Sequence, residues 1–218
     1  MGPTSLDVFA VGDASVDSYV RVPFIAGPDQ KAMGTWLGVF GGGMAANFAA
    51  AAAHTGATAS LMASIGDDAA GTQLLSELRS HRVDVSASTQ HPGMNTFQCF
   101  VQLDGSGEKA LFGAPPGEKV PRVAQVPLDL IKRSSYLYLL ADDLTWAGEL
   151  AAIAQSLGTA VVVDLERAAV GSLAARALET VGSCDIAFAN TRSFMDAGIS
   201  APDAVLDLLL EAGATTAV

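Results

Sequence analysis

The sequence predicts an α/β fold in which a mostly parallel sheet is covered by helices on both faces. Short apolar runs alternate with segments of helical periodicity along the chain, an alternation typical of parallel sheets. Half of the 218 residues are hydrophobic and only 16% are charged, which is enough apolar material for a sizeable core. Two further segments have the two-residue period of half-exposed strands and predict a small antiparallel sheet. We therefore expect a single domain over residues 1–218 that carries a β-lid.

The expected core strands are short and apolar, and helical segments separate them. The strands are Val8–Val11, Ala59–Ile65, Tyr136–Leu140, Ala160–Leu165 and Asp185–Ala189. The helices are Ala45–His54, Ala69–His81, Thr145–Leu157, Leu173–Val181 and Pro202–Ala212. Gly56 follows the first helix where a C-terminal cap commonly adopts positive φ, and the closing GATTAV has the composition of a further strand.

The lid is expected from two alternating segments, about 18–40 and 95–113. The second contains Asp104-Gly-Ser-Gly, which suits the tight turn of a hairpin. A small sheet beside a crevice can close over a substrate. The alternative is an ordinary extension of the sheet edge.

Composition excludes several classes of partner. The formal net charge of −11 argues against nucleic acid and against an anionic membrane surface. Cys99 and Cys184 lack metal-site spacing and indicate reduced cysteines of a cytoplasmic protein. No signal-peptide pattern and no membrane-spanning apolar run is present, so we expect a soluble cytoplasmic protein.

Polar residues follow every expected core strand. Ligands of open α/β sheets bind beyond the carboxyl ends of the strands, so these residues predict a polar crevice at one edge of the sheet. Individually, each could instead be a helix N-cap or turn residue. Carboxylates and amides with few cations suit a neutral ligand rich in hydroxyl groups. The residues are Asp13, Ser15, Asp17, Gly66, Asp67, Asp68, Asp142, Asp143, Asp164, Glu166 and Asn190.

The segment Phe40–Asn47, FGGGMAAN, places three consecutive glycines before an alanine-rich helix. A plain strand-to-helix turn needs about one glycine, so the run indicates a close backbone approach. A dinucleotide fingerprint is one interpretation, because Gly41, Gly43 and Ala46 satisfy G-x-G-x-x-[GA] and Asp67 lies about 20 residues on. That fingerprint should directly follow the first strand, which it does not here. We favour a loop whose amides face a ligand, with the final asparagine adding a side-chain donor and acceptor.

Together these residues resemble the ribokinase-like (PfkB) carbohydrate kinases, from Val8 to Val218. The motifs are Gly12-Asp13-x-x-x-Asp17, GGMAANFAAAAAHTGA, IGDDAAG and the hairpin beginning at Thr96. The resemblance implies a Rossmann-like three-layer sandwich with a β-lid. It also implies transfer of the γ-phosphoryl group of ATP, with Mg²⁺, to a hydroxymethyl group, and leaves a monovalent cation open.

The resemblance implies roles for particular residues. Asp17 would hydrogen-bond substrate hydroxyls, and lid residues would close over the apolar face of the sugar. Asp164 and Asn190 would lie toward the phosphate and metal. The implied substrate-binding residues are Asp13, Asp17, Gly42, Gly43, Asn47, Phe97, Cys99, Leu111 and Asp142.

The chain also departs from the family pattern. Met44 stands where ribokinase has a lysine, so that amine is absent. Ser193 stands where the family's Asn-x-x-Glu has its glutamate, beginning here at Asn190. The Asp-Thr-x-Gly-Ala-Gly-Asp segment, with the catalytic aspartate and the anion hole, is expected beyond Val218. We therefore expect no catalytic residue in this chain, no certain metal ligand, and a family fold that lacks its C-terminal part.

We expect a sugar kinase of which this chain carries the substrate half. A nucleoside kinase is the first alternative, with Phe97, Phe100 and Phe112 available to stack on a base. The second alternative is a non-catalytic sugar-binding or interaction domain. We also expect a homodimer through the lid, for which Trp36, Phe40 and Phe100 are candidate interface residues.

Overall fold

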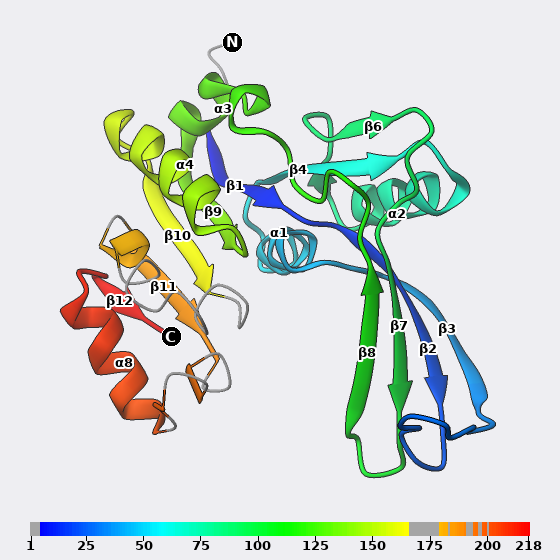
Figure 1. Ribbon diagram of the computed structural model, residues 1–218. Coiled ribbons are helices and arrows are strands. Elements are labelled where there is room, and N and C mark those ends of the chain that lie inside the picture. The colour runs from blue at the N-terminus through cyan, green and yellow to red at the C-terminus, as the bar shows by residue number, and fades with distance from the viewer. Residues whose placement is uncertain (1–4, 166–178, 183, 191–193, 196–197, 200) are drawn as a thin grey trace.

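The computed structural model describes residues 5–165, 179–182, 184–190, 194–195, 198–199 and 201–218. In these ranges the chain forms a large sheet flanked by helices, and a smaller sheet projects from this body (Figure 1). No helix within the described ranges is both long and apolar enough to cross a bilayer. The expected helix Leu173–Val181 falls largely outside the described residues.

The large sheet confirms the expected parallel arrangement. Its strands are β1 (Leu6–Gly12), β4 (Ala59–Gly66), β5 (Val83–Asp84), β6 (Thr89–His91), β9 (Ser134–Ala141), β10 (Ala160–Leu165), β11 (Ile186–Ala189) and β12 (Thr216–Ala217). Their order is β12-β11-β10-β9-β1-β4-β5, with β6 paired to β4. Each pairing seen among these described strands is parallel. The sequence did not predict β5 and β6, which are too short to give an apolar run.

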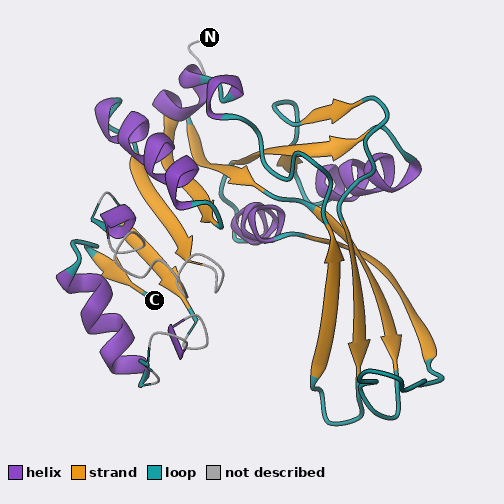
Figure 2. Ribbon diagram, in the orientation of Figure 1, coloured by secondary structure: helices purple, strands orange, loops and turns teal. Residues whose placement is uncertain are grey.

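Helices cover both faces of this sheet and produce the expected three layers (Figure 2). Helices α1 (Met44–His54) and α2 (Ala69–Ser80) lie on one face; α3 (Leu128–Arg133), α4 (Leu144–Ser156) and α8 (Pro202–Glu211) lie on the other, with a short 3₁₀ turn at Val123–Gln125. Strand β1 shows why its sequence is continuously apolar. Phe9 and Val11 pack into the cluster that contains α4, whereas Val8 and Ala10 pack into the cluster that contains α1. A strand buried on both faces has no polar side.

The lid is a separate sheet of four strands. They are β2 (Ser15–Arg21), β3 (Thr35–Gly42), β7 (Gln98–Leu103) and β8 (Lys109–Ala114), in the order β3-β2-β7-β8. The expected hairpin is confirmed, because Asp104 N donates to Glu108 O at 3.0 Å and Gly107 has a φ of 89°.

The lid is nevertheless a mixed sheet, and the expectation of a wholly antiparallel one was wrong. The β2–β3 and β7–β8 pairs are antiparallel, whereas the central β2–β7 pair is parallel. Strand β2 continues outward from β1 after Asp13 and Ala14, and β7 leaves the same side of the body after Thr96 and Phe97 (Figure 1). Because both central strands start at the body, they run in the same direction.

The order of the large sheet identifies where a ligand would bind. The chain builds the sheet from β1 toward β4 first, and later from β9 toward β12, so the order reverses between β1 and β9. These two strands are neighbours, with Val11 opposite Leu139. Ligands of such sheets bind beyond the carboxyl ends of the strands at this switch point. Asp13 follows β1 and Asp142 follows β9 there.

Candidate substrate site

Asp13 is buried, with 5% of its surface exposed, and it caps a helix. Its Oδ1 accepts hydrogen bonds from Met44 N at 2.8 Å and from Ala45 N at 3.3 Å. Helix α1 has a glycine, Gly43, at its own N-cap, so Asp13 supplies the capping carboxylate from the turn that follows β1. Burial raises the pKa of Asp13, although the charge of Lys119 and the helix amides act to lower it. Asp13 therefore joins β1 to α1 at the switch point.

Asp17 lies on the lid directly above the second glycine of the run. Ser15 Oγ donates to Asp17 Oδ1 at 2.7 Å. A β-carbon built on Gly42 would lie 2.4 Å from Asp17 Oδ2, so only glycine leaves room for the carboxylate. Across the sheet, Asp17 is opposite Cys99, whose thiol pKa is raised by burial and by the charge of Asp17. Both therefore lie on one face of the lid.

Each of the three glycines lies close to a different part of the protein. Gly41 N donates to both carboxylate oxygens of Glu77 at 3.2 Å, and a β-carbon there would press on the same carboxylate. Gly42 makes room for Asp17. Gly43 has a φ of 92°, and its β-carbon would lie 2.6 Å from the Cα of Ala14. The three glycines permit close approach of protein to protein.

Three amides around the glycine run bind the protein itself, whereas the predicted substrate contacts of Gly42 and Gly43 stay a prediction. The amide of Gly41 binds Glu77, and the amides of Met44 and Ala45 bind Asp13. A pyrophosphate on the N-terminus of α1 would need those last two amides, so the dinucleotide interpretation fails on the same contacts.

Asn47 lies apart from Asp17. Its side chain is exposed on α1 and lines a small cavity of about 80 Å³ with Gly41, Gly42 and Glu77. Asp17 does not line this cavity, and Gly42 lies between the two. The role of Asn47 in substrate binding stays a prediction.

The lid residues Phe97 and Cys99 lie together. A β-carbon on Gly113 would be 2.9 Å from Phe97 Cε2 and 3.6 Å from Cys99 Sγ. Leu111, 55% exposed, lies two residues along β8 from Gly113 and therefore on the same face.

Phe100 and Phe112 lie on the other face of the lid. Phe100 and Phe112 stack with their ring centroids 4.9 Å apart, and Phe100 follows Cys99 in β7. Successive residues of a strand point to opposite faces, so these rings cannot share a base with Phe97. Phe40 instead packs edge-on against Tyr19 at 5.7 Å.

Sequence reasoning missed a cation beside the end of β9. Lys119 Nζ lies 2.6 Å from Asp142 Oδ2 and 5.6 Å from the centroid of the Phe97 ring. It comes from the segment that follows β8, so the pair connects the lid's return strand to the end of β9. The sequence held only a weak indication of this role. The chain has 12 Lys and Arg residues, and Lys119 is one that lies just beyond the predicted lid.

Asp164 and Asn190 end neighbouring strands on the far side of the switch point. Tyr138 Oη donates to Asp164 Oδ2 at 2.8 Å. Burial raises the pKa of Asp164, the Tyr138 hydrogen bond acts against this, and the charge of Asp13 adds to it. Glu166 and Ser193 lie outside the described residues.

The described residues do not assemble a metal site. Within those ranges no group of three or more His, Cys, Asp or Glu side chains could hold an ion. Asp164 has a tyrosine partner, and the exposed Asn190 is an amide, a weaker magnesium ligand than a carboxylate. The expected Mg²⁺ therefore remains a prediction that these residues do not support by themselves.

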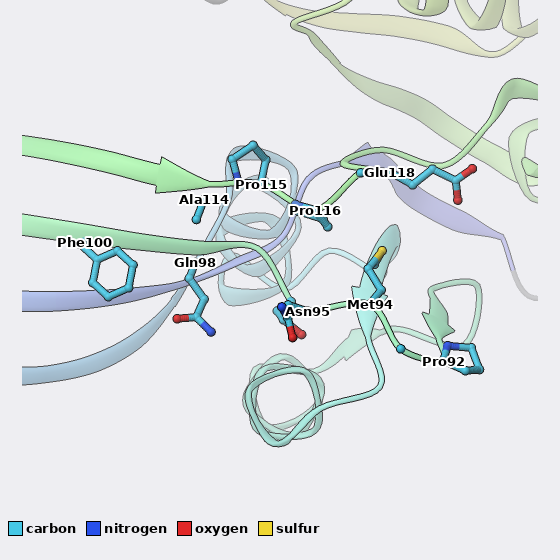
Figure 3. A pocket seen from close by; sticks show the side chains of 12 residues that line it. Pro92, Met94, Asn95, Gln98, Phe100, Ala114, Pro115, Pro116 and Glu118 are labelled. Atoms are coloured by element: carbon cyan, nitrogen blue, oxygen red, sulfur yellow. The ribbon is translucent and has the colours of Figure 1, made fainter.

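A cavity of about 680 Å³ lies elsewhere. It opens where β7 and β8 leave the body, and Figure 3 shows Asn95, Gln98, Phe100 and Glu118 around it. None of the predicted substrate-binding residues lines it. Gln98 and Phe100 lie on the lid face opposite Cys99, so this cavity is on the other side of the lid from Asp17. We place the candidate site where the carboxylates gather.

The three-layer arrangement and the projecting lid define a Rossmann-like α/β fold. The family model described as pfkB family carbohydrate kinase matches residues 5–216. The chain belongs to this family, whose members are phosphotransferases.

Curated relatives and solved structures agree with this family. The chain is 24% identical over 184 residues to a nucleoside kinase of Methanothermobacter thermautotrophicus, covering 84% of this chain and 60% of the relative. It is 27% identical over 186 residues to an ATP-dependent ribose-1-phosphate kinase of Halopiger xanaduensis, covering 85% and 62%. The fructokinase structure of Halothermothrix orenii matches with a TM-score of 0.80 at 16% identity, covering 98% of this chain and 80% of that one. The chain thus spans about six tenths of the length of both curated relatives.

Proposed function

We propose that the protein containing these residues transfers the γ-phosphoryl group of ATP to a hydroxymethyl group of a small sugar. The observation that carries the proposal is the carboxylate of Asp17, which Ser15 fixes above Gly42 beside the switch point. A carboxylate accepts hydrogen bonds from sugar hydroxyls. ATP as donor is consistent with the name of the relative from Halopiger xanaduensis.

In this proposal the described residues bind and orient the sugar. Asp17 accepts from substrate hydroxyls, and Phe97, Cys99 and Leu111 of the same lid face cover its apolar side and exclude water. Phosphoryl transfer depends chiefly on positioning and on stabilising the charge of the moving group. Asp164 and Asn190 are assigned to the phosphate side. The described residues are assigned binding and orienting roles only.

A kinase assay on the product of the full reading frame tests the proposal. ADP formation would be measured with ribose, fructose, ketodeoxygluconate and adenosine. Asp17→Ala should raise KM by about tenfold or more, since it removes hydrogen bonds to a charged acceptor. Failure of every sugar to support turnover, or an unchanged KM in the variant, would refute the proposal.

A nucleoside kinase is the second candidate. The relative from Methanothermobacter thermautotrophicus carries that name, and Phe97 lies on the Asp17 side of the lid, where it could contact a base. With Phe100 and Phe112 on the other face, the aromatic surface available to a base is smaller than the sequence indicated. Turnover of adenosine above that of ribose and fructose in the same assay would favour this candidate. Sugar binding without turnover would favour a non-catalytic domain.

We also propose that the lid forms a homodimer through its outer face. Trp36 and Phe112 are 59% and 60% exposed, and with Phe100 they line a shallow apolar cavity of about 410 Å³. Exposed apolar clusters of this kind are typical of interaction sites. Phe40, expected at the interface, packs against Tyr19 on the inner face instead.

A further inference from the structure

The ion pair between Lys119 and Asp142 lies at the point where the lid meets the sheet. Lys119 Nζ is 2.6 Å from Asp142 Oδ2, and the ring of Phe97 lies below the ammonium at 5.6 Å. The two side chains remain 28% and 33% exposed, so a ligand can reach both of them. Phe97 belongs to the Asp17 face of the lid, which places the pair beside the candidate sugar site.

The charge around this pair is predominantly negative. Asp13 follows β1, the neighbour of β9, and the charge of Lys119 acts to lower the pKa of Asp13 against the effect of burial. The charge of Asp13 in turn acts to raise the pKa of Asp164 and of Cys99. Among the ion pairs formed by described residues, this is the one that places a cation in the crevice. Because the ammonium is already paired with Asp142, it offers an arriving anion little net positive charge, while Asp13 adds a further carboxylate within electrostatic range.

We propose that the Lys119–Asp142 pair determines substrate specificity, by binding adjacent hydroxyls of a neutral sugar and rejecting sugars that carry an anionic group. The Lys119 ammonium donates a hydrogen bond to the oxygen of one sugar hydroxyl. The other carboxylate oxygen of Asp142, Oδ1, accepts a hydrogen bond from the adjacent hydroxyl. A paired donor and acceptor match the alternating donors and acceptors of a polyol. This inference rests on the proposed function, since it concerns the same site. It predicts that ketodeoxygluconate, a carboxylate, is not the substrate.

A purely structural role is the competing explanation, because the pair also fastens the segment after β8 to the body. That segment has another attachment: Trp146 Nε1 donates to Pro121 O at 2.7 Å, and this bond is buried. Loss of the ion pair should therefore leave the segment anchored. A contact that only anchors the segment would not change the preference between neutral and phosphorylated sugars. A contact that determines specificity would change it.

Isothermal titration with ribose, fructose, ribose 5-phosphate and ribose 1-phosphate tests the inference on the 218-residue chain and on the full reading-frame product. The wild type should bind a neutral sugar at least about tenfold more tightly than its phosphate ester.

Asp142→Asn removes the neutralising carboxylate and frees the ammonium, so it should shrink or reverse this preference by about tenfold. Lys119→Met, which keeps a long apolar stem over Phe97, should weaken binding of the neutral sugar by about tenfold, and Lys119→Arg should restore much of it. The matched control is Lys109→Met, at an exposed position in β8 at the lid tip.

The outcomes separate this inference from the proposed function. If Asp17→Ala abolishes sugar binding while Asp142→Asn leaves the preference unchanged, the inference is wrong and the proposed function stands. A wild type that prefers a phosphorylated sugar also overturns it. If no sugar binds, or Asp17→Ala has no effect, the proposed site itself fails. Thermal unfolding of each variant shows whether a lost affinity reflects lost folding.

Discussion

The carboxylate of Asp17 lies over the Cα of Gly42 so closely that a β-carbon on that glycine would come within 2.4 Å of Oδ2. Gly42→Ala should therefore displace Asp17 and weaken sugar binding by about tenfold. The effect should resemble that of Asp17→Ala, because both variants remove the same acceptor from the crevice. Titration calorimetry with the preferred sugar measures it.

Gly105→Ala is the matched control for that prediction. Gly105 lies in the lid hairpin, and a β-carbon there would meet no atom within 4 Å. This variant should bind sugar as the wild type does. Equal affinities of Gly42→Ala and wild type would show that the position of Asp17 does not matter for binding.

Asp68 anchors the second lid connection to the body. It accepts from Thr96 Oγ1 at 2.6 Å, from Thr96 N at 3.0 Å and from Gly71 N at 2.7 Å, so it caps α2 as well. Burial acts to raise the pKa of Asp68, but these hydrogen bonds outweigh it and the pKa lies below the ordinary value of 3.8. Asp68→Ala should lower the free energy of unfolding by about 1 kcal/mol, or about 2–4 °C in Tm.

The pH dependence of that effect follows from the lowered pKa. A carboxylate with a depressed folded-state pKa stabilises the fold above its unfolded pKa and loses this contribution as the pH falls through the folded value. The difference in unfolding free energy between wild type and Asp68→Ala should be full at neutral pH and should shrink below about pH 4. Denaturant titrations across this range measure it, and a difference that grows with acidity would contradict the assignment.

Tyr138 and Asp164 form a partly buried pair whose contribution to stability should also be lost on acidification, at a higher pH than that of Asp68 because the pKa of Asp164 is raised. Burial raises the pKa of Asp164, and the Tyr138 hydroxyl acts against the rise. Tyr138→Phe should cost about 1–3 kcal/mol of stability at neutral pH by leaving the carboxylate without that donor. Protonation removes the charge of Asp164 and weakens its hydrogen bond with Tyr138. The loss of stability in Tyr138→Phe should therefore become smaller as the pH drops through the raised folded-state pKa of Asp164.

The control is Tyr136→Phe, in the same strand but 41% exposed, which should change stability by less than about 0.5 kcal/mol. Denaturant unfolding of both variants near neutral pH and near about pH 5 separates the cases. Equal losses for the two tyrosines would show that the Asp164 contact contributes nothing.

The sequence predicted the parts of the fold that hydrophobic pattern determines. Strands β1, β4, β9, β10 and β11 were found because burial on both faces makes them continuously apolar. Strands β5 and β6 are too short to give a pattern. The parallel β2–β7 pair depends on where two distant segments leave the body, which no local pattern encodes.

At the site, residue types were predictable but contacts were not. The alternative that these carboxylates cap helices is right for Asp13, Asp68 and Asp143. Asp17 instead accepts a hydrogen bond from Ser15, and Asp142 pairs with Lys119. The glycine run indicated close approach correctly, but its neighbours belong to the protein itself: the carboxylates of Glu77 and Asp17 and the backbone of Ala14. The role of Lys119 was not predicted, because its partner Asp142 lies 23 positions away in the sequence.

The outer face of the lid yields the last prediction. Trp36, Phe100 and Phe112 leave an apolar surface on β3, β7 and β8, and two copies related by a two-fold axis would bury it. Phe112→Asp should convert a dimer into a monomer, because a charge at the centre of an apolar interface loses its hydration without gaining a partner. Light scattering after size exclusion measures the mass. Leu128→Asp, on exposed α3 of the body, should leave the mass unchanged. A wild type that is monomeric at high concentration would refute the interface, and a dimer unaffected by Phe112→Asp would place it elsewhere.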